Sequence, residues 1–156
     1  MSAGDPRRES GGAGGGVPVR GLGHIAIAVR EAEPLLAILV GALGATRGAE
    51  ELLDGGALRV VFVHLGPVTF ELLEPRSPGH TVAKFIDRRG GGLHHVSLEV
   101  NDLEAALARC REAGVQLIDR TPRAGAHGQP IAFLHPQSLG GVLIELCQAA
   151  PKPPSS

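Results

Sequence analysis

Two short stretches, GLGHIAIAV at residues 21–29 and GLHHVSLEV at residues 92–100, share one pattern. Each begins with Gly-Leu, carries a histidine, and then alternates toward a final valine, so that His24 aligns with His95. Side chains alternate between the two faces of a β-strand. Each stretch is therefore predicted to be a strand that presents its histidine on one face, and the repeat predicts a chain of two similar halves.

The composition limits the classes of protein to which the chain belongs. With 156 residues, 43% of them apolar, it is long enough for one globular unit, and four Phe without Trp or Tyr predict an aliphatic core. A net charge of −1 argues against nucleic acid and anionic membrane partners. The two cysteines, Cys110 and Cys147, are too few for a disulfide framework. No stretch is long enough for a membrane-spanning helix.

The repeat also predicts the organisation of the chain. Residues 1–20 are rich in Gly, Arg and Ser without an apolar period, so they are predicted to form a disordered tail, as are residues 150–156. A single domain is expected over 21–149, with module one at about 21–75, a linker at 76–91 and module two at about 92–148.

Each module is predicted to be β-α-β-β-β, which makes the fold class α+β. The apolar periods predict helices within 30–45 and 101–115, with Asn101 or Asp102 as the cap of the second, and a short linker helix at 81–88. The second strand of each module is expected before Leu58 and near Gln116–Leu117. The remaining strands are expected at 57–65, 68–75, 130–136 and 141–147.

Four polar residues occupy equivalent places in the two halves. His24 and His95 share their strand faces with small residues, while Glu71 and Glu145 interrupt apolar strands. A buried carboxylate is costly unless it is paired or binds a metal. A single strand histidine is usually structural, but four such residues at repeat-equivalent positions favour a divalent metal site for Co²⁺, Mn²⁺, Fe²⁺, Ni²⁺ or Zn²⁺. His94 is predicted to lie on the opposite face and to take no part.

Several stretches resemble the vicinal oxygen chelate (glyoxalase) superfamily and, within it, the methylmalonyl-CoA epimerase family, over residues 21–148. They are GHIAIAV (23–29), VVFVHLG (60–66), FELLEP (70–75), GGGLHHVSLEV (90–100), GAHGQPIAFLHP (125–136) and GGVLIEL (140–146). The resemblance implies two fused modules that form a half-open, barrel-like sheet around a metal site. It implies His24, Glu71, His95 and Glu145 as ligands of a divalent metal, with Co²⁺ expected and Mn²⁺, Ni²⁺ or Zn²⁺ as alternatives.

The implied activity is the interconversion of (R)- and (S)-methylmalonyl-CoA by proton abstraction at C2 through a metal-stabilised enolate. Such a reaction needs two acid/base groups, one for each face of C2. Glu145 is the implied catalytic residue for one face. Some bacterial members carry a catalytic glutamate that aligns approximately with Arg59, which cannot act as a base. His127 and His135 are weaker alternatives, so the second group stays unassigned.

The same resemblance implies an acyl-CoA substrate, for which Lys84, Arg88, Arg89 and Arg123 are the cationic candidates. A homodimer is expected, in the mitochondrial matrix of a eukaryote or the cytoplasm of a bacterium.

Three other activities use related sites. A glyoxalase-type lyase would bind a hemithioacetal in the same cage, and an extradiol dioxygenase would use Fe²⁺ and leave Glu71 free. A drug-sequestering binder would lack the ligands. The stretch GAHGQPIAFLHP favours the epimerases over the lyases.

Overall fold

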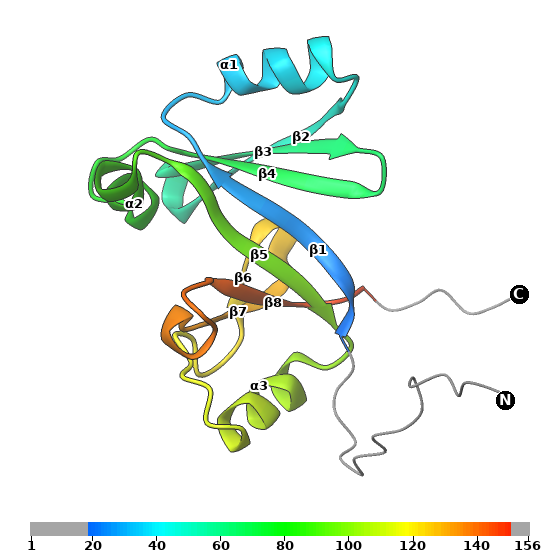
Figure 1. Ribbon diagram of the computed structural model, residues 1–156, viewed down its shortest axis with the longest axis vertical. Helices are drawn as coiled ribbons and strands as arrows, with labels where there is room; N and C mark the ends of the chain where they lie inside the picture. The colour runs from blue at the N-terminus through cyan, green and yellow to red at the C-terminus, as the bar shows by residue number, and fades with distance from the viewer. Residues whose placement is uncertain (1–18, 151–156) are drawn as a thin grey trace, which may run out of the picture.

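The computed structural model describes residues 19–150, which form one eight-stranded mixed sheet with three α-helices (Figure 1). The strands are β1 (Val19–Ala28), β2 (Thr46–Leu53), β3 (Leu58–Leu65), β4 (Val68–Pro75), β5 (Gly92–Val100), β6 (Arg123–Ala124), β7 (Pro130–Leu134) and β8 (Ile144–Gln148). The helices are α1 (Glu33–Leu36), which continues as a π-helix over Ala37–Ala42, α2 (Thr81–Arg89) and α3 (Leu103–Glu112). Of the predicted tails at 1–20 and 150–156, residues 1–18 and 151–156 lie outside the described residues.

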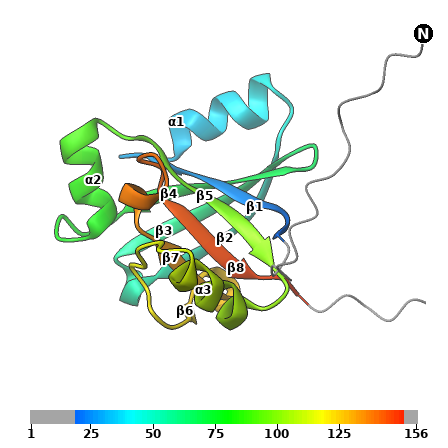
Figure 2. The same cartoon turned by 60° about the horizontal axis from the view of Figure 1, so that its bottom comes forward.

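The sheet is built from two copies of the same unit. Its strand order is β2-β3-β4-β1-β5-β8-β7-β6, so the outer strands mirror each other around the central pair β1 and β5. β1 and β5 are antiparallel to each other, while β1 pairs in parallel with β4 and β5 with β8. Figure 2 shows this central pair between the two halves. The predicted pair of β-α-β-β-β modules, and with it the α+β half-barrel, is confirmed.

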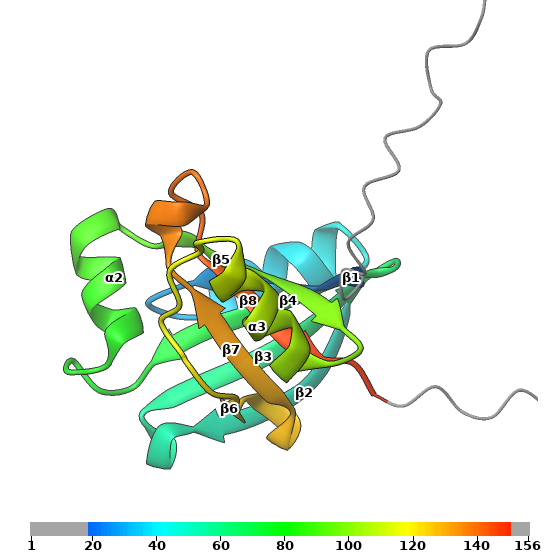
Figure 3. The same cartoon turned by 90° about the horizontal axis from the view of Figure 1, so that it is seen from below.

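Apolar residues hold the helices against the sheet in three clusters. Leu36 and Leu39 pack on Val61, Val63 and Leu72 beneath α1. The corresponding cluster beneath α3, which Figure 3 shows in front of the second module, contains Leu103, Ala106, Leu107, Ala132, Leu134 and Leu146. A third cluster joins α2 to the concave side of module one through Val82, Ile86, Val60, Phe62 and Leu73. Burial of each large aliphatic side chain contributes about 1.5–3 kcal/mol.

Local signals explain where the helices begin. The Asp102 side chain accepts a hydrogen bond from the backbone N–H of Ala105 at 2.9 Å, which identifies Asp102 as the cap of α3. Pro34 lies in the first turn of α1, where a proline is tolerated. His80 caps α2 by accepting from the N–H of Val82 at 3.2 Å. Within residues 19–150, no helix is long and apolar enough to cross a membrane.

Two boundaries differ from the sequence-based expectation. β1 begins at Val19, two residues earlier than the predicted start of the domain. In module two, Leu117 forms only an isolated bridge with Leu134, and β6 lies later, at Arg123–Ala124. The backbone N–H of Gln116 donates to the Ser138 hydroxyl at 2.9 Å, so it does not contribute to a longer strand ladder.

Candidate metal centre

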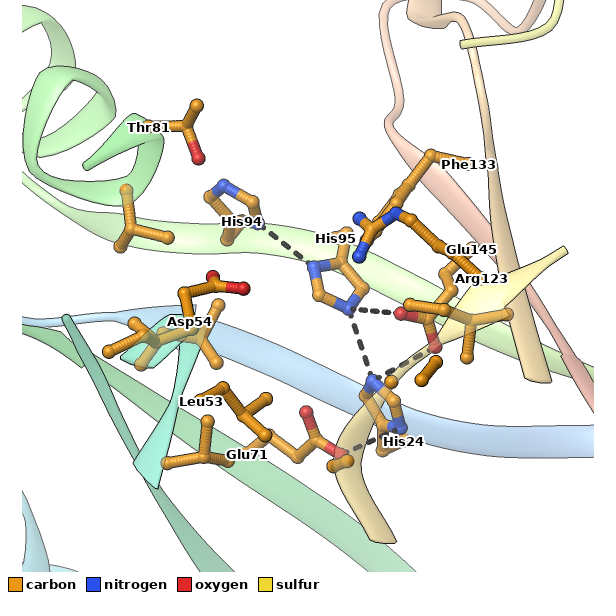
Figure 4. A pocket seen from close by; sticks show the side chains of 18 of the residues that line it. His24, Leu53, Asp54, Glu71, Thr81, His94, His95, Arg123, Phe133 and Glu145 are labelled. Atoms are coloured by element: carbon orange, nitrogen blue, oxygen red, sulfur yellow. Dashed lines mark hydrogen bonds and ion pairs between the residues drawn. The ribbon is translucent and has the colours of Figure 1, made fainter. Parts of the chain in front are cut away.

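Three side chains from three neighbouring strands meet on the concave face of the sheet. His24 of β1, His95 of β5 and Glu145 of β8 have donor atoms that all lie within 4.8 Å of one another (Figure 4). The two Nε2 atoms are 3.1 Å apart, and the Glu145 oxygens lie 3.6 Å from Nε2 of His24 and 3.7 Å from Nε2 of His95. The strand register explains the meeting, since Ser97 of β5 lies opposite both His24 and Glu145.

Each imidazole is also held at its second nitrogen. Glu71 of β4 places Oε1 3.2 Å from Nδ1 of His24, and His94 places Nδ1 2.9 Å from Nδ1 of His95. Partners of this kind orient metal-binding histidines and fix their tautomers. The arrangement directs both Nε2 atoms toward Glu145. Glu71 itself lies beside the three-residue group rather than within it.

The prediction that His94 points away from the site was wrong. His95 pairs with Ala26, but the next paired residues are Leu93 and Ile27, so the register shifts and a β-bulge falls at His94. A bulge breaks the alternation of side chains, and His94 lines the same pocket as His95. Strict alternation over GLHHVSLEV could not reveal this, although the preceding glycines, such as Gly92 with φ 101°, signal an irregular start.

A buried hydroxyl orients Glu145. Ser97 is fully buried and donates a hydrogen bond to Oε1 of Glu145 at 2.8 Å. Gly23 lies directly against this contact, because a Cβ at that position would come within 3.1 Å of the Ser97 hydroxyl oxygen. The glycine before His24 therefore leaves room for Ser97.

Burial sets the protonation of the four site residues. Desolvation lowers the pKa of His24 to about 4 and that of His95 to about 2, and repulsion from the protonated forms of His24 and His94 and from Arg123 is a smaller cause for His95. Desolvation, then repulsion from Glu145 and Glu51, raises the pKa of Glu71 to about 8. Desolvation likewise raises the pKa of Glu145 to about 7, against the lowering effect of the Ser97 hydrogen bond. Both imidazoles are neutral at pH 7, the state in which they bind metals.

This donor set fits a divalent transition metal. Two neutral imidazole nitrogens and a carboxylate converge, with a second carboxylate adjacent, and Glu71, His95 and Glu145 are all buried. Buried carboxylates that repel each other are stabilised in their ionised form by a cation. Imidazole and carboxylate together suit the later first-row divalent metals.

The site lies in a pocket of about 400 Å³. Of the predicted substrate-binding cations, Arg123 lines this pocket, with its guanidinium 5.3 Å from the centre of the Phe133 ring. Lys84, Arg88 and Arg89 lie on α2 and are exposed, outside the pocket lining.

The position predicted by alignment for the second base lies on the other face of the sheet. The Arg59 guanidinium donates hydrogen bonds of 2.8–3.1 Å to the carboxylates of Glu33, Glu50 and Glu74. Its neighbours Leu58 and Val60 line the pocket instead. His127 and His135 also lie outside the lining.

Two pocket residues were missed by the sequence analysis. Asp54, in the turn between β2 and β3, and His80, before α2, both line the pocket and meet at 2.8 Å. They are far apart in sequence and belong to loops that differ between the modules, so the repeat gives no signal for them. The sequence DGG at residues 54–56 was the only local sign of an unusual turn there.

Comparisons with known proteins identify the class. Residues 23–133 match the glyoxalase/bleomycin resistance protein/dioxygenase superfamily, and the chain belongs to it. Together with this match, the paired modules and the enclosed His-His-Glu group place the chain among the enzymes of this superfamily.

Closer relatives narrow the family. The chain is 39% identical to the mitochondrial methylmalonyl-CoA epimerase of Bos taurus, over 86% of this chain and 79% of the relative. It is 40% identical to the ethylmalonyl-CoA/methylmalonyl-CoA epimerase of Cereibacter sphaeroides, over 81% of this chain and 96% of the relative. A solved methylmalonyl-CoA epimerase in complex with methylmalonyl-CoA and NH4+ superposes with a TM-score of 0.79 at 28% identity, covering 85% and 96% of the two chains. Within its superfamily, the chain belongs to the methylmalonyl-CoA epimerases.

Proposed function

We propose that this chain interconverts (R)- and (S)-methylmalonyl-CoA at C2 with the help of a divalent metal. The observation that carries the proposal is the convergence of His24, His95 and Glu145 in one pocket of a chain from the epimerase family. His24, His95 and Glu145 are the proposed ligands, and Glu71, beside His24, is the proposed fourth. When bound, the metal would supply Lewis-acid stabilisation of the negative charge that forms on the thioester and carboxylate oxygens of the enolate.

The residues of the chain then have separate tasks. Glu145 exchanges a proton with one face of C2, and Ser97 holds one of its oxygens by the 2.8 Å hydrogen bond. The other carboxylate oxygen is left for the reacting atom. Arg123 lines the pocket beside Phe133 and is placed to contact an anionic group of the acyl-CoA.

The remaining assignments extend this proposal. Co²⁺ is the proposed native metal, as the family resemblance implies, and Mn²⁺, Ni²⁺ and Zn²⁺ are alternatives that the same His-His-carboxylate set suits. We also propose a homodimer, and a location in the mitochondrial matrix if the source is eukaryotic or in the cytoplasm if it is bacterial. Lys84, Arg88 and Arg89 stay as proposed contacts for the part of coenzyme A that extends beyond the pocket.

The test is metal-dependent inversion. Chelator-treated protein is reloaded with Co²⁺ and given (S)-methylmalonyl-CoA, and a mutase that accepts only the (R) epimer reports the product. Ethylmalonyl-CoA and a glutathione hemithioacetal are run in parallel. Inversion that appears with Co²⁺ and is absent from Glu145→Gln supports the proposal, whereas turnover of the hemithioacetal alone would make the protein a glyoxalase-type lyase.

A further inference from the structure

Inversion at C2 requires an acid/base group on the face away from Glu145, and the pocket lining narrows the choice. Among the lining residues within 19–150, the titratable ones outside the metal group and its contacts are Asp54, His80, Arg123 and Cys147. An arginine does not act as a base. Cys147 lies two residues from Glu145 on the same strand and therefore on the same wall. Asp54 and His80 remain.

The contacts of His80 define its tautomer. Its Nδ1 accepts a hydrogen bond from the backbone N–H of Val82 at 3.2 Å, so Nδ1 carries no proton. The proton must then reside on Nε2 in the neutral ring, where it is donated to Oδ2 of Asp54 at 2.8 Å. The His80 side chain is only 12% exposed and also caps α2, so both burial and the cap hold this donor in place. One oxygen of Asp54 is held and the other is free.

The backbone of Asp54 supports the same conclusion. Asp54 has φ 52°, a conformation that few non-glycine residues adopt, and Gly55 and Gly56 continue the turn with positive φ. Such residues cluster at functional sites. The carboxylate is 60% exposed and open to a ligand. Figure 4 shows it pointing into the pocket from the side opposite Glu145, with His24 and His95 between the two carboxylates.

We propose that Asp54 is the second acid/base residue of the reaction, acting on the face of C2 opposite to Glu145, and that His80 positions it. This inference rests on the proposed function. For one epimer, the Asp54 carboxylate takes the C2 proton and becomes a carboxylic acid, while the C–H bonding electrons pass into the enolate. The Glu145 carboxylic acid then gives its proton to the other face. The reverse reaction, or proton exchange with water, restores both groups.

Asp54→Asn is the decisive variant, because asparagine tolerates the same positive φ and cannot accept the proton as a base. Asp102→Asn is the matched control: it makes the same chemical change at the cap of α3, where asparagine also caps well. Each Co²⁺-loaded protein is incubated in D₂O with each epimer separately. NMR measures deuterium entry at C2 of either epimer, the coupled mutase measures inversion of the (S) epimer, and a titration measures Co²⁺ affinity.

The expected result separates exchange from inversion. Asp54→Asn should lose at least about 100-fold in inversion, the size of a general acid/base contribution, with unchanged Co²⁺ affinity. It should still exchange the proton of the one epimer that faces Glu145, within a few-fold of the wild-type rate. Asp102→Asn should match wild type in all three measurements.

His80→Ser tests the positioning role, since serine keeps the cap of α2 but is too short to reach Asp54. Its ratio of exchange to inversion should rise at least tenfold, and the change should vanish when Asp54→Asn is already present. A purely structural role would lower both rates together.

The inference is overturned if Asp54→Asn inverts at the wild-type rate, or if it loses exchange of both epimers while still binding Co²⁺. Absence of both exchange and inversion in the Co²⁺-loaded wild type would instead overturn the proposed function, and this inference with it.

Discussion

The two modules place a carboxylate at the same position of their closing strands but treat it differently. In module two, Ser97 donates a hydrogen bond to Glu145, and Glu145 joins the group formed with His24 and His95. In module one, the position equivalent to Ser97 is Ala26, which has no hydroxyl and lies opposite Glu71. Glu71 turns instead to Nδ1 of His24.

The histidines differ in a corresponding way. The partner at Nδ1 of His24 is a carboxylate, whereas the partner at Nδ1 of His95 is the imidazole of His94, brought there by the bulge. One buried hydroxyl and one bulged residue thus make two similar halves chemically unequal. This inequality supports the separate roles that we propose for the two carboxylates, with Glu145 as ligand and acid/base group and Glu71 as fourth ligand beside His24.

The largest predicted effect is the loss of a ligand. His95→Ala should weaken Co²⁺ binding by more than about 100-fold, because it removes a nitrogen donor from the centre. His94→Ala removes only an orienting partner, and such changes cost about 10–100-fold. Calorimetric titration of both variants checks the order, and equal affinities would mean that His95 is not a ligand.

Metal binding should depend strongly on pH. The raised pKa values of Glu71, about 8, and Glu145, about 7, mean that protons compete with a cation for both carboxyls in this pH range. Co²⁺ affinity should therefore rise more than about tenfold from pH 6 to pH 8.

The folding stability of the metal-free protein should fall over the pH range in which metal affinity rises. Because these folded-state pKa values lie above the usual 4.5, ionisation of Glu71 and Glu145 costs the folded state stability as the pH rises from 4.5 through 8. Thermal unfolding with and without Co²⁺ should give curves that separate with increasing pH. A gap that narrows toward pH 8 would contradict the assignment of the carboxylates.

Removing the hydroxyl of module two should have a smaller effect. Ser97→Ala leaves Glu145 without its orienting donor, so Co²⁺ affinity should fall about 10–100-fold, with unchanged melting of the metal-free protein to within a few degrees. Ser138→Ala, which removes a hydroxyl outside the pocket lining, is the control. Wild-type affinity in Ser97→Ala would show that the hydrogen bond has no part in holding the ligand.

The smallest effect is expected from the opposite substitution in module one, which adds a hydroxyl instead of removing one. Ala26→Ser puts a hydroxyl opposite Glu71 and should lower the pKa of that carboxyl by stabilising its ionised form. Co²⁺ affinity should then change by less than about tenfold and depend less on pH between 6 and 8. An unchanged pH dependence would mean that the Ala26–Ser97 difference does not explain the behaviour of Glu71.

The repeat made much of this predictable. His24 and His95 align because the modules repeat, and a period of two puts them on one face, so the pair of modules and the concave position of the histidines follow from sequence. His94 did not, because a bulge depends on the pairing of two distant strands. The catalytic glutamate of some bacterial members aligned approximately with Arg59, but the alternation of Arg59 with the pocket-lining Leu58 and Val60 puts its side chain on the other face. The positions of Asp54 and His80 could not be predicted, because they depend on the three-dimensional course of two loops that the repeat does not share.

The most direct test of the central claim, that the two modules together form one metal site, is the number of Co²⁺ ions bound per chain. Chelator-treated protein is titrated with Co²⁺ and followed by visible absorption and by metal analysis after gel filtration. We predict one tightly bound ion per chain, absent from both His24→Ala and His95→Ala. Binding that survives the loss of either histidine, or two ions per chain, would contradict a single centre shared between the modules.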